Sequence, residues 1–576
     1  MADCLLCGIP TNLISNSNQE TANSNLARWT DNLSLFVLCV WVAIIVTTIL
    51  VPLYSDEIAT KMMQAAAITN GWKFNTLYPE CHSDFLLNIP VSMRPGAFAY
   101  GVLYAKTTPL GIRIISVVTA LCCGALLAVA VRWVFPHRRL YLPTLAVVAA
   151  VTGLGVLPLT LGLARAEQWL VLLLTLFILF PALVKRIARP GQRARLLACL
   201  VVFCFAASFF FYCHPKAVFF FPVVVVSAYF SFRSRNIALC TAAVVFVLAC
   251  TVQSVSFSSG ATKCEDAPVL SGLLASQTTA PGMLAKSPTA FVHELFTNLT
   301  SAPYAINDYL TFQENYQSDW LPSMNGITAA PWIALINVCI KAVLAISIWL
   351  AVLIPPISVG IPLLRRIAGY RTALIATLWI GLLGHLMLYK VWTFYGGSLV
   401  VPLAALLMLL CAGESRWTSR SPTWAAGILA PLFVVFLASA SVVFTTVAPR
   451  LLTTVHPVGI GLPNQALSIP TFEFAEQRQQ VREFARKCGL EGDGARRLVV
   501  DNTTYFAFDG LREPLHLAYL NEGYYGADFK GEQMRTLLLK IGVKGIIGQC
   551  TFLAPHFETE ALKDGNLCCL KLDESR

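Results

Sequence analysis

The chain of 576 residues alternates between long apolar runs and short polar segments. The first run, Leu33 to Leu53, has about 20 residues, the length that a helix needs to cross the hydrocarbon core of a bilayer. Further runs of similar hydrophobicity follow it. Together they predict about eleven membrane-spanning helices, near residues 33–53, 111–134, 141–161, 167–184, 196–213, 217–232, 237–255, 331–357, 372–389, 397–412 and 424–447.

Two long loops interrupt these runs, at residues 54–110 and 256–330. In the first loop, apolar residues recur at helical spacing and predict a helix lying on the membrane interface; they are Ile58, Met62, Met63, Ala66 and Ala67. The second loop carries aromatic residues suited to the headgroup layer or to an acceptor groove; they are Tyr304, Tyr309, Phe312, Tyr316 and Trp320.

The tail at residues 448–576 differs in composition from the apolar runs. Helices are predicted at Phe472–Lys487 and Gly531–Lys540, and short buried strands at Arg497–Asp501 and Val543–Ile547. We therefore expect a small α/β domain outside the membrane, following a transmembrane domain at residues 33–447.

Composition supports this organisation, because 56% hydrophobic residues, 13% charged residues and a mean hydropathy of +0.65 exclude a soluble domain of this size. The net charge of +11 does not indicate nucleic acid as a partner, since the basic residues form short clusters between apolar runs. These clusters lie at residues 137–139, 185–195, 233–235, 365–371 and 416–420. If they are cytoplasmic, the protein is a multi-pass protein of the plasma or inner membrane, with a cytoplasmic N-terminus and extracytoplasmic loops and tail.

Residues 1–32 are polar, lack the features of a cleaved signal, and are expected to form an unstructured cytoplasmic tail. Cys4 and Cys7 could alternatively be a metal or redox pair. Six cysteines are expected on the oxidising side, where disulfides are permitted although their pairing stays open; they are Cys81, Cys264, Cys488, Cys550, Cys568 and Cys569.

The first candidate site residues are Asp56 and Glu57, which follow the first apolar run directly. Acids at a helix end can simply mark the water boundary, but here other charged groups return to the same face. Arg94 precedes the second run, and its guanidinium suits a phosphate or a lipid headgroup. Arg165 and Glu167 occupy the turn between the third and fourth runs, either as a structural ion pair or as part of a site.

Further candidates occupy two later turns on the same face. His214 and Lys216 lie in the first, and Lys390 and Tyr395 lie in the second. The lysines could also be cations that extend toward the membrane surface, and His214 could be a residue that only shapes its turn.

In this order the motifs resemble the membrane glycosyltransferases of the C fold (GT-C) that use lipid-phosphate sugars, especially lipid A aminoarabinose transferases and protein O-mannosyltransferases. Asp56-Glu57 is similar to the acidic pair after their first helix, and Met93–Tyr100 to their Lys-Pro-Pro-Leu-aromatic segment. Ala164–Glu167 looks like their Ala-Arg-x-Asp turn, and Lys390 with Tyr395–Pro402 like their basic-aromatic-Leu-Pro segment. The resemblance spans residues 33–412 and leaves the tail unmatched.

Three positions depart from the family pattern: Arg94 replaces Lys, Gly96 replaces the second Pro, and Glu167 replaces Asp. The charges are kept, so the resemblance implies an all-α, GT-C-like membrane protein with about eleven spans. It also implies transfer of a hexosyl or pentosyl unit from a polyprenyl-phosphate donor to a glycan, lipid or protein acceptor on the extracytoplasmic face.

Such a transfer needs a base for the acceptor proton and cations for the departing phosphate. The expected catalytic residues are Asp56, Glu57 and Glu167. The expected phosphate-binding residues are Arg94, Arg165, Lys390 and Tyr395, with His214 and Lys216 as further candidates. The residues indicate no cofactor and leave a divalent metal open. The alternatives are a lipid or sugar transporter or flippase, and a scaffold of a cell-envelope assembly.

Overall fold

The computed structural model describes residues 12–54, 56–71, 89–135, 138–188, 191–265, 268–316, 320–366, 369–414, 422–454, 468–469, 475–490, 497–508, 511, 513–517, 531–557 and 560–572. Cys4, Cys7 and Cys81 lie outside these ranges. Within them, ten helical segments are long and apolar enough to cross a membrane, so the chain is a multi-pass membrane protein.

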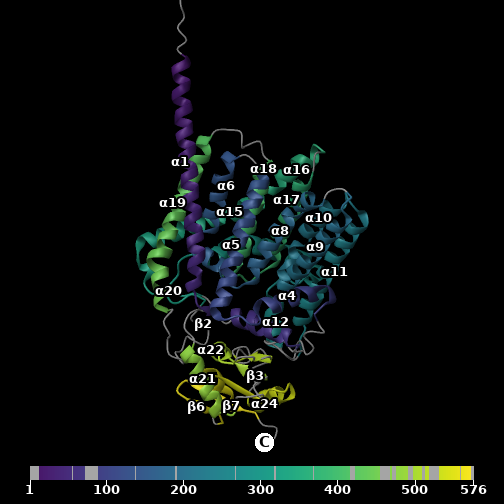
Figure 1. The fold of residues 1–576 in the computed structure, drawn as a ribbon, viewed down its shortest axis with the longest axis vertical. Helices are drawn as coiled ribbons and strands as arrows, with labels where there is room; N and C mark the ends of the chain where they lie inside the picture. The colour runs from purple at the N-terminus through teal and green to yellow at the C-terminus, as the bar shows by residue number, and fades with distance from the viewer. Residues whose placement is uncertain are drawn as a thin grey trace, which may run out of the picture.

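The spanning segments follow the predicted runs closely, and Figure 1 shows their helices packed as one bundle. Four of the spanning segments combine a main helix with a short neighbouring element. These elements are η1 (Thr48–Leu50), η5 (Pro215–Phe220) and α16 (Pro355–Leu364), and in the fourth segment η9 (Val443–Val447) followed by α20 (Ala448–Thr454). The main helices are α1 (Asn12–Thr47), α5 (Pro109–Val134), α8 (Ala166–Ile187), α9 (Arg193–Cys213), α10 (Phe221–Phe232), α11 (Ile237–Ala261), α15 (Pro331–Leu353), α17 (Tyr370–Leu388), α18 (Gly396–Glu414) and α19 (Pro422–Val442).

The run at residues 141–161, predicted as one span, is broken in two. It forms α6 (Arg138–Thr152) and the short α7 (Leu157–Leu161). Between them Gly155 has φ +58°, and the Val156 N–H donates to the Leu310 carbonyl at 3.0 Å. A Cβ at Gly155 would lie 1.9 Å from that carbonyl oxygen, so only glycine fits this turn.

The N-terminal segment also differs from the prediction. It was expected to be unstructured up to residue 32, whereas α1 begins at Asn12. Figure 1 shows this helix continuing well beyond the other helices of the bundle.

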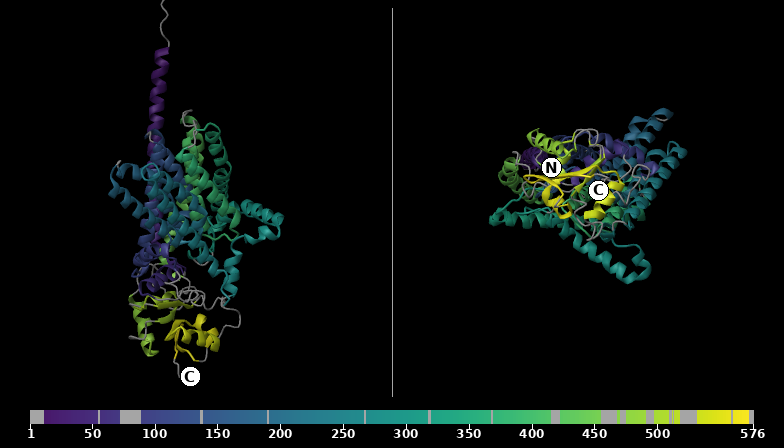
Figure 2. Two further views of the ribbon diagram at one scale, coloured as in Figure 1. Left: turned by 90° about the vertical axis from the view of Figure 1, so that its right-hand side faces the viewer. Right: turned by 90° about the horizontal axis from the view of Figure 1, so that it is seen from below.

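A five-stranded sheet lies at the opposite end of the bundle from the start of α1 (Figures 1 and 2). Its strand order is β4-β3-β5-β7-β6, with β4, β3 and β5 parallel and β7 and β6 antiparallel. The strands are β3 (Arg497–Val500), β4 (Glu513–His516), β5 (Gly545–Gln549), β6 (Leu562–Asp564) and β7 (Leu567–Lys571), accompanied by α21 (Ala475–Lys487), α22 (Asn502–Tyr505), α24 (Gly531–Lys540) and α25 (Cys550–Phe557).

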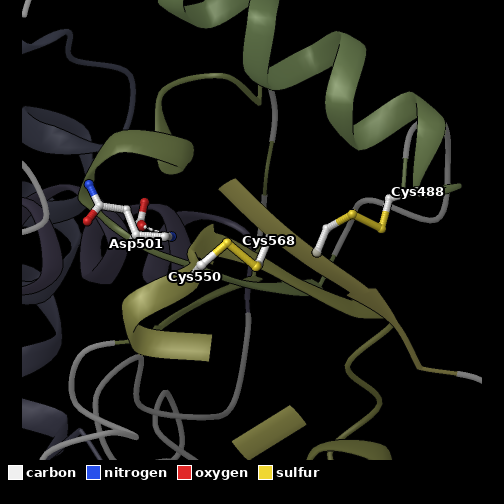
Figure 3. The surroundings of a disulfide bond; sticks show 6 residues. Cys488, Asp501, Cys550 and Cys568 are labelled. Atoms are coloured by element: carbon white, nitrogen blue, oxygen red, sulfur yellow. Dashed lines mark hydrogen bonds between the residues drawn. A yellow bond between two sulfur atoms is a disulfide. The ribbon is translucent and has the colours of Figure 1, made fainter. Parts of the chain in front are cut away.

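Two disulfides fasten helices to the sheet. Adjacent residues of β7 point to opposite faces, and Cys568 bonds to Cys550 of α25 while Cys569 bonds to Cys488, just after α21. Figure 3 shows both bonds, with Asp501 near the Cys550–Cys568 pair. Cys264 is disulfide-bonded as well. The sequence permitted these bonds, and the structure gives the pairing for the four tail cysteines.

The sheet packs on the first loop. Strand β1 (Leu53–Tyr54) pairs antiparallel with β2 (Ser468–Ile469), and β4 contacts the helical segment formed by η2 (Glu57–Met63) and α2 (Gln64–Thr69). This segment was predicted to lie on the membrane interface. Instead its apolar residues are all buried, because the bundle covers one side and the sheet the other.

Candidate active site

The charged candidates gather at the end of the bundle that faces the sheet. Asp56 precedes η2 and Glu57 begins it, Arg165 and Glu167 lie at the start of α8, and Lys216 lies in η5. Since consecutive spans run in opposite directions, these distant segments return to one end. The segment at η2 is π-helical, a rare conformation that occurs frequently at functional sites.

Glu57 is held in a fully buried clamp. Its two carboxylate oxygens accept hydrogen bonds from Arg113 Nη1 and Nη2 at 2.7 and 2.9 Å. They also accept the backbone N–H groups of Ala164 at 2.6 Å and Tyr54 at 3.3 Å. Arg113 in turn donates to the carbonyls of Val51 and Pro52 at 3.0 and 2.7 Å. With both oxygens occupied and no exposed surface, Glu57 joins the first loop to α5 and is unsuited to react.

Asp56 belongs to a different arrangement. Its Oδ2 lies 2.5 Å from Arg165 Nη1, and 31% of its side chain is exposed. Arg165 Nε lies 3.5 Å from Glu167 Oε2, and the other Glu167 oxygen lies 2.8 Å from Lys216 Nζ. We call these four residues the Asp56 network. Its fully buried acid, Glu167, occupies the first turn of α8, where the helix dipole favours a carboxylate.

Aromatic rings hold the two cations of this network. The Arg165 guanidinium lies 3.9 Å from the ring centroid of Tyr395, and Lys216 Nζ lies 4.9 Å from the same ring and 5.1 Å from that of Tyr389. Tyr395 therefore contacts both cations, as a cation–π partner. Its neighbour Phe394 stacks on Trp320 at 5.2 Å.

The second loop contributes a buried aromatic layer rather than a headgroup anchor at most of the predicted positions. Phe312, Tyr316 and Trp320 are buried, whereas Tyr304 is exposed. The Tyr316 ring meets the Trp320 ring edge-on at 5.3 Å. This layer supports the turn that carries Tyr395.

Two of the cations expected to hold a phosphate, Arg94 and Lys390, have their partners outside the Asp56 network. Arg94 is exposed at the start of α4 (Arg94–Tyr104), where its Nε donates to the Ile89 carbonyl at 3.3 Å. Lys390 is paired with Glu294 of α14 (Pro288–Asp308). Among the described residues, neither cation forms an ion pair with an acid of the Asp56 network.

His214 shapes the turn before η5. Its Nδ1 accepts the Lys216 backbone N–H at 3.1 Å. Burial, with the nearby Lys216 charge, lowers the pKa of His214 to about 3. The imidazole is therefore neutral at physiological pH, in keeping with the interpretation that it caps the turn.

Sequence reasoning missed two residues of this region, Arg113 and Lys61. Arg113 is a cation near the start of a long apolar run, and a charge inside a span is a signal of a partner or a site. Lys61 of η2 is 4% exposed, and its ammonium lies over the rings of Tyr100 and Tyr104. Within the described ranges, no group of three or more His, Cys, Asp or Glu side chains gathers as a metal site would require.

No protein-family model matches this chain, and no curated protein matches it either. Fold and site together define a multi-pass helical membrane protein with a small C-terminal sheet and a network of charged residues where sheet and bundle meet.

Proposed function

We propose that the protein is a membrane glycosyltransferase that moves a sugar from a polyprenyl-phosphate donor to an acceptor hydroxyl or amine. The observation that supports this most is the position of Asp56. It is a half-buried carboxylate in contact with a cation, at the exposed edge of a buried network of fixed charge. General-base transfer next to an anionic leaving group requires this combination of a reachable carboxylate and a held cation.

In the proposed reaction an acceptor O–H or N–H attacks the anomeric carbon of the sugar. The bond from that carbon to the phosphate oxygen breaks, and the polyprenyl phosphate leaves with the electron pair. Asp56 takes the acceptor proton. Glu57 has no part in this step, because Arg113 and two backbone N–H groups occupy its carboxylate.

Arg165 is the cation best placed to act on the leaving phosphate. It touches Asp56 at one end and is supported by Glu167 and Tyr395. A guanidinium has five N–H donors, so it can hold these partners and still face a phosphate oxygen. Glu167 and Lys216 are positioning residues that fix Arg165. The proposal thus keeps the predicted phosphate-binding role of Arg165 and withdraws it from Arg94 and Lys390.

Two observations support an extracytoplasmic site. The Cys488–Cys569 and Cys550–Cys568 disulfides belong to the sheet that packs on η2, and disulfides persist in oxidising compartments. The other end of α8 carries Lys185 and Arg186 in its last turn, as the positive-inside rule expects of a cytoplasmic end.

The direct test is sugar transfer by the purified protein in detergent, with a panel of short-chain polyprenyl-phosphate sugars. A transferase releases polyprenyl phosphate and glycosylates the acceptor without a bilayer. A transporter or flippase leaves the sugar–phosphate bond intact. Mass spectrometry of the lipid fraction separates the two, and intact donor across the whole panel would contradict the proposal.

A further inference from the structure

Among the described residues, the Glu57 clamp and the Asp56 network join three acids to three cations, and Lys61 lies beside them as a fourth cation. The acids are Asp56, Glu57 and Glu167, and the cations paired with them are Arg165, Arg113 and Lys216. Among the described residues, Lys61 forms no ion pair. Its Nζ lies over the rings of Tyr100 and Tyr104, 4.9 and 5.7 Å from the ring centroids.

Lys61 is also placed with the network. It follows Asp56 by one π-helical turn of η2 and is 4% exposed. The titratable groups that interact electrostatically with the Lys61 ammonium come from η2, α4, the start of α8, α9 and the turn before η5. They are Glu57, Tyr100, Tyr104, Arg165, Glu167, Cys213 and His214. Tyr100 is fixed by donating its hydroxyl to the Thr60 carbonyl, so the ring follows η2.

A lone cation removed from water is costly unless it meets an anion, and two tyrosine rings offset only part of that cost. A methionine of similar length would pack there without this penalty. The arrangement is therefore unfavourable for folding alone, and is explained if an anion completes the site.

We propose that Lys61 binds the phosphate of the lipid-linked donor, with Arg165 on the same group. This inference rests on the proposed function, and deepens it by assigning the phosphate to a residue outside the family-like motifs. The phosphate is a diester in the donor and becomes a monoester in the polyprenyl phosphate that leaves, and this leaving product is the probe. Phosphatidic acid also carries a phosphate monoester and inorganic phosphate carries the same anionic group, and we assign polyprenyl phosphate.

Burial lowers the pKa of Lys61 to about 8. Above that pH the free protein loses the charge, so phosphate affinity should fall by up to about tenfold per pH unit while the bound lysine stays protonated. The second ionisation of the phosphate lies near 6, so a titration from pH 7 to 9.5 reports the lysine.

The experiment measures binding of short-chain polyprenyl phosphate to the full chain in nanodiscs. Lys61→Met should weaken binding about 10- to 100-fold at pH 7. Lys61→Arg should bind like wild type at pH 7, and its phosphate affinity should not fall above pH 8 as that of wild type does. The matched control is Lys106→Met, at an exposed lysine of the same loop, which should bind like wild type.

Thermal unfolding separates this role from a structural one, because Lys61→Met should unfold at the same or a higher temperature than wild type. Wild-type affinity in a folded Lys61→Met protein would overturn the inference while leaving the transferase intact. Equal binding of phosphatidic acid or inorganic phosphate would overturn the donor assignment. If wild type itself binds no polyprenyl phosphate, the inference and the proposed function both fail.

Discussion

The Glu57 clamp and the Asp56 network begin at adjacent residues of one helix and differ in almost every physical respect. Glu57 has no exposed surface, and its two oxygens are occupied by one arginine and two backbone N–H groups. Asp56 is 31% exposed and meets its arginine through a single oxygen. Two adjacent acids in a sequence can therefore have opposite surroundings, one with both oxygens occupied inside the fold and one with an accessible carboxylate.

The same difference separates the two arginines. Arg113 donates to the carbonyls of Val51 and Pro52 as well as to Glu57, so its N–H groups are used in contacts that stabilise the fold. Arg165 is shared between two acids and a tyrosine ring. The clamp should consequently govern stability, and the network should govern activity.

The largest stability effect is expected when the clamp is broken on one side. Arg113→Met leaves the Glu57 charge buried without its partner and should cost about 3–5 kcal/mol of unfolding free energy. Glu57→Gln combined with Arg113→Met should recover much of this loss, because no unpaired charge remains. Thermal unfolding in detergent measures both. A double variant no more stable than Arg113→Met would show that the two residues act separately.

A smaller loss is expected inside the network. Lys216→Met removes the 2.8 Å contact to Glu167 and leaves that acid to Arg165 alone, which should cost about 1.5–3 kcal/mol. Lys487→Met is the matched control, because its pair with Asp564 in the tail is exposed and should be worth less than about 1 kcal/mol. Equal losses in the two variants would argue against a buried network.

The smallest effect is expected at Arg94. It is exposed and outside the network, so Arg94→Ala should change unfolding free energy by no more than about 0.5 kcal/mol. Donor affinity should also stay within about threefold of wild type, a difference of under about 1 kcal/mol. Isothermal titration with polyprenyl phosphate measures this, and a tenfold weakening would return Arg94 to the phosphate site.

Much of the fold followed from local pattern. The apolar runs predicted the ten long spanning segments, and α21, α24, β3 and β5 lie where the tail predicted them. The break before α7 was missed because its cause is the distant Leu310 carbonyl, which approaches Gly155. The burial of η2 and α2 was missed because a sheet from the other end of the chain covers them.

The sequence predicted which residues meet at the site better than it predicted which acid pairs with which cation. Asp56, Arg165, Glu167 and Lys216 do come together, as their shared face suggested. A shared face says nothing about which cation meets which acid. Lys390 therefore proved to pair with Glu294, a residue that no pattern singled out.

The central claim is that Asp56 is the acid that takes the acceptor proton. Its most direct test is the single-turnover rate of sugar transfer by Asp56→Asn, compared with Asp564→Asn as a control at an exposed, lysine-paired aspartate of the tail. We predict that Asp56→Asn slows transfer about 10²- to 10⁴-fold. Its unfolding temperature should stay close to that of wild type, and Asp564→Asn should transfer normally. Transfer at the wild-type rate by folded Asp56→Asn protein would contradict the account.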